Sequence, residues 1–66
     1  MSVDFRQAAN ELILELLGDA GRPLTAVEVA DQLVIAPSTA FQILHSLAGY
    51  GLVRRVDDSM IRWVKA

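Results

Sequence analysis

The chain has 66 residues, no cysteine and a formal net charge of −2. A chain of this size has room for one apolar core, and the absence of cysteine excludes both a disulfide framework and a thiolate metal site. The acidic balance argues against a protein that binds polyanions over its whole surface, and no apolar run approaches the roughly 20 residues that cross a bilayer. We therefore expect one soluble, cytoplasmic domain over residues 1–66.

The first predicted element is a helix over about residues 4–17. Its apolar residues recur at the three- and four-residue spacing of a helix that buries one face; they are Phe5, Ala8, Ala9, Leu12, Ile13 and Leu16. Gly18 is expected to end this helix, because the segment from Gly18 to Pro23 is dense in turn residues. Leu14 and Leu17 lie at or beyond the edge of the apolar face.

Two further helices are predicted to follow each other closely. Thr25 and Glu28 have the spacing of a capping box, which predicts a helix over about residues 26–33. Pro37 suits the first turn of a third helix over about residues 37–50, because its missing N–H is not needed there. This third helix has its own apolar stripe, formed by Ala40, Ile43, Leu44 and Leu47. The connection between the two helices is therefore a tight turn.

The C-terminal part of the chain predicts a β-hairpin over about residues 52–64. Residues 52–56 and 60–64 are short runs rich in β-branched, aromatic and long side chains, and residues 57–59 form a short tip between them. The whole chain is thus expected to be a mainly α domain with a small hairpin.

Residues 24–53 resemble the DNA-binding domains of the IclR and MarR families of regulators. The resemblance is carried by Leu24-Thr25 followed by Glu28-Val29-Ala30, by Pro37-Ser38-Thr39-Ala40, and by the exit from Leu47 to Val53. It implies a winged helix-turn-helix fold, in which the third helix is the recognition helix and the hairpin is the wing. It also implies DNA binding, although the same fold serves elsewhere as a protein-interaction module.

Two features of the sequence depart from the pattern of these families. Val34 stands where they usually have glycine, and a β-branched residue at positive φ costs on the order of 1–3 kcal/mol, which a turn of slightly different shape would avoid. The exposed face of the recognition helix carries no arginine or lysine. A bidentate cation contact to guanine is therefore not available from this helix.

The candidate DNA contacts on the recognition helix point away from its apolar stripe; they are Ser38, Thr39, Phe41, Gln42 and His45. Ser38 and Thr39 are expected to bind a phosphate at the helix start or to cap the helix. Gln42 suits a bidentate contact to adenine. Phe41 contacts a thymine methyl, anchors a protein interface or tucks under the wing. His45 is a surface residue or a phosphate contact, since a lone histidine does not build a metal site.

The wing concentrates positive charge. Residues 1–53 hold six acidic and two basic residues, whereas residues 54–66 hold Arg54, Arg55, Arg62 and Lys65 against Asp57 and Asp58. We expect Arg54, Arg55 and Arg62 to contact DNA phosphates. The alternative is a solvated strand in which Arg54 or Arg55 pairs with an aspartate.

Two functions follow as hypotheses. The first is a small transcriptional regulator that binds double-stranded DNA, as a homodimer whose contact includes Leu14, Leu17 or Trp63, although Trp63 equally suits the core. The second is a winged helix that binds protein within a larger assembly, a reading favoured by the sequence pI of about 5.0 and by Phe41. Neither function needs a cofactor, a metal or a membrane. An enzyme is not expected, because the chain has no glycine-rich phosphate loop and no second histidine.

Overall fold

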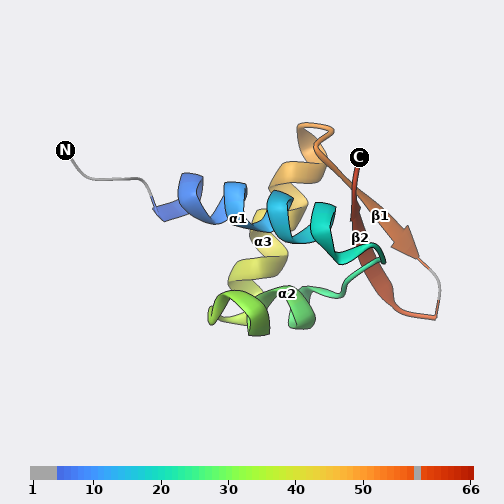
Figure 1. The fold of residues 1–66 in the computed structure, drawn as a ribbon, viewed down its shortest axis with the longest axis horizontal. Helices are drawn as coiled ribbons and strands as arrows, with labels where there is room; N and C mark the ends of the chain where they lie inside the picture. Colours follow the sequence, from blue (N-terminus) through green and yellow to red (C-terminus); the bar gives the residue numbers. More distant parts are fainter. Residues whose placement is uncertain (1–4, 58) are drawn as a thin grey trace.

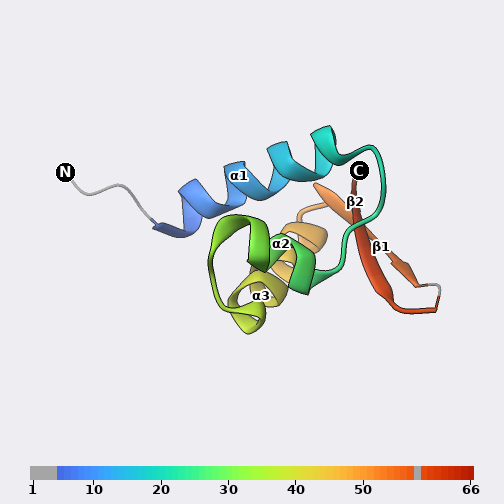
Figure 2. The same cartoon turned by 60° about the horizontal axis from the view of Figure 1, so that its bottom comes forward.

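The computed structural model describes residues 5–57 and 59–66, with side chains from residue 7 onward. Its elements in chain order are α1 (Phe5–Ala20), α2 (Ala26–Leu33), α3 (Pro37–Gly49), β1 (Val53–Asp57) and β2 (Ile61–Lys65). The views in Figures 1 and 2 show α1 lying along one side of α2 and α3, with the hairpin at the end of the helical layer. The predicted fold class, three helices followed by a two-stranded wing, is confirmed. In the described part of the chain, no helix has the length and apolar character needed to cross a membrane.

Helix α1 continues beyond the predicted stop at Gly18 and ends at Ala20. Glycine inside a helix costs only about 0.5–1 kcal/mol relative to alanine. The residue that ends the helix is Gly21, whose φ of 69° is the left-handed conformation that glycine adopts without strain. The predicted start near residue 4 lies outside the described residues.

The buried face of α1 also differs from the predicted one. Leu17 is only 5% exposed and belongs to the core, whereas Leu12, expected on the apolar face, is 51% exposed. The core residues of α1 are Ala9, Ile13 and Leu17, which follow one another at intervals of four. Because the helix extends one turn further than predicted, Leu17 lies well within it and packs into the core.

The turn between α2 and α3 has the shape that usually requires glycine. Val34 adopts φ 56° and ψ 50°, in the left-handed region, and its backbone N–H donates to the carbonyl of Ala30. Its side chain is 89% exposed, so no packing compensates for the strained backbone. The expectation of a turn with a different shape is wrong, since Val34 adopts the left-handed conformation that favours glycine.

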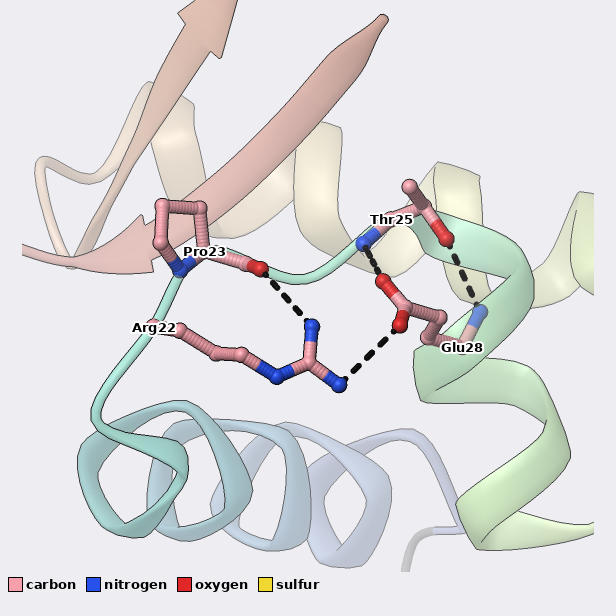
Figure 3. A network of polar contacts seen from close by, with 4 residues as sticks. All are labelled: Arg22, Pro23, Thr25 and Glu28. Carbon is pink, nitrogen blue, oxygen red and sulfur yellow. Dashed lines mark hydrogen bonds and ion pairs between the residues drawn. The ribbon is translucent and has the colours of Figure 1, made fainter.

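The predicted capping box is present at the start of α2. The backbone N–H of Glu28 donates to Thr25 Oγ1 at 3.1 Å, and the N–H of Thr25 donates to Glu28 Oε1 at 2.9 Å. Arg22 adds to this network by donating from Nη2 to Glu28 Oε2 at 3.1 Å, as Figure 3 shows. The three residues tie the connection after α1 to the first turn of α2.

This network predicts a pH dependence of stability. The hydrogen bond from the Thr25 N–H, followed by that from Arg22, lowers the pKa of Glu28 from its ordinary value of 4.5. A carboxyl whose pKa is lower in the folded state stabilises the fold above its unfolded pKa, and this contribution is lost as the pH falls through the folded pKa. We expect Glu28→Gln to lower Tm at about pH 7 and to have a smaller effect at about pH 3. Thermal melts of the wild type and of Glu28→Gln measure the difference in Tm at each pH. A difference in Tm that is as large in acid as at neutral pH contradicts this account.

The core joins the helices to the sheet at Trp63. Strands β1 and β2 are antiparallel with Arg55 opposite Trp63, and Leu24 forms a bridge on the other side of Trp63. The backbone groups of Leu24 and Trp63 exchange two hydrogen bonds, of 3.0 and 2.7 Å. Trp63 is 1% exposed and packs with buried residues from all three helices. Its burial fixes the position of the wing relative to α3.

Candidate nucleic-acid interface

The exposed face of α3 carries the side chains that the sequence predicts there. Helix α3 buries Ala40, Ile43, Leu44 and Leu47. Away from this stripe, Ser38, Phe41, Gln42 and His45 are exposed and Thr39 is half-buried. Helix α3 contains no aspartate, glutamate, lysine or arginine. Its exposed face therefore offers hydroxyl, amide, imidazole and aromatic groups.

The first turn of α3 lacks a side-chain cap. Its N-cap residue is Ala36, which has no side-chain hydrogen bond, and Pro37 follows as the first helical residue. The suggestion that Ser38 or Thr39 caps the helix is therefore wrong, since both residues lie inside the first turn. The N-cap side chain provides no acceptor for the backbone N–H groups of this first turn. These N–H groups lie at the positive end of the helix dipole. Such a helix start is suited to an anionic oxygen.

Three aromatic rings form a row from α3 to the wing. The ring centroids of Phe41 and His45 are 5.9 Å apart with an interplanar angle of 30°. Phe41 meets Trp63 edge to face, at 6.2 Å and 80°. Phe41 nevertheless keeps 39% of its surface exposed, so it combines a contact to the core with an outward apolar face.

The strand register sorts the wing cations onto two faces. Arg54 lies opposite Val64 and Arg62 lies opposite Val56, which puts the two arginines on the same outer face of the hairpin. Arg55 points to the other face, where its Nε donates to both carboxylate oxygens of Asp57, at 2.9 and 3.1 Å. The predicted pairing of an arginine with an aspartate is thus observed for Arg55, and the hydrogen bond that Arg55 donates to Asp57 raises the pKa of Arg55.

Two of the residues proposed for a dimer contact are not on the surface. Leu17 and Trp63 belong to the buried core, at 5% and 1% exposure. Leu14 is partly buried and packs against that core. The side chain of Lys65, the fourth cation of the wing, lies close to Gly18 of α1, where an added Cβ would be 3.4 Å from Lys65 Cδ. A dimer contact through Leu17 or Trp63 is therefore excluded in this fold.

An apolar groove that the sequence did not predict lies between the start of α2, α3 and the wing. Its volume is about 490 Å³, and its lining includes Thr25, Val27, Phe41, Met60, Ile61 and Trp63. In the sequence, this groove is indicated only by apolar residues that lie outside the buried stripes of the predicted helices and strands. Val27 lies off the buried stripe of α2, and Met60 precedes β2 at the tip of the hairpin.

The three helices, the tight turn and the wing define a winged helix-turn-helix DNA-binding domain. The sequence profile of the IclR helix-turn-helix domain matches residues 12–57. The chain belongs to this family. A search of the curated proteins found no match.

Solved structures agree with this assignment of the fold. The Zalpha domain of PKZ from Carassius auratus, solved in complex with Z-DNA, superposes with a TM-score of 0.88 at 17% identity, covering 96% of this chain and 100% of that one. A MarR family protein from Bacillus stearothermophilus gives 0.79 at 28% identity, covering 86% of this chain and 41% of that one. ZitR from Lactococcus lactis gives 0.78 at 24% identity, covering 100% and 47%. The chain spans less than half the length of the latter two proteins.

Proposed function

We propose that this domain is a transcriptional regulator that inserts α3 into the major groove of double-stranded DNA and lays the wing along the phosphate backbone. The observation that carries the proposal is the uncapped start of α3 beside an exposed row of hydrogen-bonding side chains. Ser38 and Thr39 present hydroxyls and N–H groups to a phosphate. Gln42 and His45 follow on the same exposed face, where Gln42 suits adenine.

The wing supplies the charge for this contact. Arg54 and Arg62 share the outer face of the hairpin, and each neutralises a phosphate when the wing lies on the backbone. Two such contacts give weak binding per subunit. We therefore propose a homodimer that reads two half-sites about one helical turn apart and acts without a cofactor in the cytoplasm.

A second candidate function is binding to a protein partner in a larger assembly. The apolar groove favours it, because Phe41, Met60 and Val27 expose apolar surface beside one another. The two functions depend on different side chains. Replacement of Phe41 weakens a protein contact most, whereas replacement of the wing arginines weakens a DNA contact most.

Fluorescence anisotropy of a labelled mixed-sequence duplex, titrated at about 50 and 200 mM salt, tests the proposal. With about 0.9 released counterions per phosphate contact, Arg54 and Arg62 give log K a slope near −1.8 against log salt, or about a twelvefold loss of affinity over this range. We expect the double variant Arg54→Ala, Arg62→Ala to remove most of this slope.

Asp57→Asn is the matched control on the same strand. It releases Arg55 from its ion pair on the hairpin face opposite Arg54 and Arg62, so we expect the slope to change little. Absence of binding by the wild-type chain at both salt concentrations contradicts the proposed function. A slope that survives the double arginine variant contradicts the role given to the wing.

A further inference from the structure

The free edge of strand β1 carries a pattern of charge that complements a second copy of the same strand. We propose that two copies of the domain associate through β1, which pairs with β1 of the second copy in an antiparallel register centred on Val56. The inference rests on the homodimer in the proposed function and assigns the surface through which the two copies meet. Leu17 and Trp63 are buried within the single chain, so the homodimer needs another contact.

The outer edge of β1 offers backbone hydrogen-bonding groups. Leu24 and Trp63 exchange backbone hydrogen bonds of 3.0 and 2.7 Å on the far side of β2, so the N–H and C=O of Trp63 point away from β1. In an antiparallel ladder, two opposite residues either exchange both hydrogen bonds or make none with each other. Arg55 lies opposite Trp63, so its N–H and C=O point away from β2. The same groups of Asp57, two residues further on, point to the same free edge.

This edge of β1 is accessible. Figure 1 shows β2 between β1 and the connection from α1 to α2, so β1 is the outer strand of the hairpin. Among the described residues, no backbone hydrogen bond outside the hairpin involves Arg55 or Asp57. Their side chains are 44% and 56% exposed. A strand edge with unpaired backbone groups is a template for pairing with another chain.

The order of charges along β1 favours its own copy as the partner strand. Two arginines precede Val56 in the sequence and two aspartates follow it. When the strand lies antiparallel to its own copy in the register centred on Val56, Arg55 of each copy lies opposite Asp57 of the other, with both side chains on the same face. Opposite charges at directly opposed positions stabilise a strand pair. By the twofold symmetry, this favourable pair occurs twice.

The same charges disfavour the neighbouring registers. Registers that bring the free N–H and C=O groups of both strands together differ by two residues. The register centred on Arg55 places the two copies of Arg55 opposite each other, and the register centred on Asp57 places the two copies of Asp57 opposite each other. Like charges at opposed positions destabilise a strand pair. Charged side chains usually prevent pairing at a sheet edge, but in β1 they exclude the slipped registers and permit the one centred on Val56.

The single chain already holds half of the resulting network of charges. Arg55 Nε donates to both carboxylate oxygens of Asp57 in the same strand, at 2.9 and 3.1 Å. In the dimer each arginine gains the carboxylate of the opposite strand as well, so charges of alternating sign surround the twofold axis. Such a network contributes more to stability than an isolated surface pair does. Val56, which is half-buried, meets its own copy on the other face of the joined sheet.

The test is sedimentation equilibrium of the wild-type chain and of two charge-reversed variants, over about 10 µM–1 mM protein. We expect the wild type to form a dimer. Arg55→Asp surrounds the axis with carboxylates alone, and Asp57→Arg surrounds it with guanidinium groups alone. Each variant by itself is therefore expected to raise the Kd of the dimer about tenfold or more. An equimolar mixture of the two variants is expected to form a heterodimer with a Kd near that of the wild type, because opposite charges again face each other.

Lys65→Asp is the matched control. It reverses the charge of an exposed residue on β2, the strand that does not meet the second copy, and is expected to leave the Kd of the dimer unchanged. A wild-type chain that stays monomeric over this range overturns the inference. A dimer that neither charge-reversed variant weakens also overturns it, as does a mixture that associates no better than each variant alone. Heterodimer formation in the mixture also shows that both variants fold.

The outcomes separate this inference from DNA binding. A monomeric wild-type chain that binds the labelled duplex with the expected salt dependence overturns the contact through β1 and leaves DNA binding intact. A dimer that both charge-reversed variants weaken and the mixture restores supports the contact, even where the wild-type chain binds no duplex and the proposed function is contradicted.

Discussion

Replacement of Trp63 by alanine is expected to remove a large part of the stability of the domain. Trp63 is 1% exposed and is the largest side chain in the core, where it packs with residues from all three helices. Truncation of a buried tryptophan to alanine costs about 3–5 kcal/mol. At roughly 0.05–0.15 kcal/mol per residue, a domain of this length has about 3–10 kcal/mol of stability in total. Urea unfolding followed by circular dichroism measures the loss.

Trp63→Phe separates the loss of volume from the loss of the aromatic contact. The buried Nε1 of Trp63 has no hydrogen-bond partner among the described residues. Phenylalanine removes this unsatisfied donor, whose desolvation costs about 1–3 kcal/mol, and keeps a ring against Phe41. We therefore expect a much smaller loss than for alanine. Equal losses for the two variants would show that the core depends on the full indole volume.

The fold could be predicted largely because short-range signals agree with one another. The capping box of Thr25 and Glu28, the proline at the start of α3 and the apolar stripe of α3 all reappear in the structure. The end of α1 was predicted wrongly because two glycines compete for the role of stop signal. Of these two glycines, Gly21 has the positive φ of a helix end, and the choice between Gly18 and Gly21 depends on where Leu17 packs.

The candidate site was predictable where it depends on one element and unpredictable where it combines several. Helical spacing alone indicates that Gln42 and His45 are exposed. The pairing of Arg55 with Asp57 was one of two open alternatives, and the structure shows it between two residues on the same face of β1. The apolar groove joins Val27, Phe41 and Met60 from three separate parts of the chain. Their proximity arises only when the wing packs against α3.

The turn between α2 and α3 gives the last prediction, in which a substitution at an exposed residue raises stability. Val34 is 89% exposed and sits at φ 56°, so its side chain contributes strain and almost no packing. Glycine removes a strain of about 1–3 kcal/mol but adds freedom to the unfolded chain, worth about 0.5–1 kcal/mol. We expect Val34→Gly to raise the free energy of unfolding by about 1 kcal/mol and Tm by about 4–8 °C.

The same chemical change inside a helix provides the control. Val27 is also exposed, but it lies in the first turn of α2 with helical backbone, so Val27→Gly brings no relief of strain and lowers Tm. Asparagine, which tolerates the left-handed region better than valine, should place Val34→Asn between wild type and Val34→Gly. A decrease in Tm for Val34→Gly would mean that valine is not strained at this turn. The opposite signs at positions 34 and 27 would show that backbone conformation, and not hydrophobicity, decides the effect.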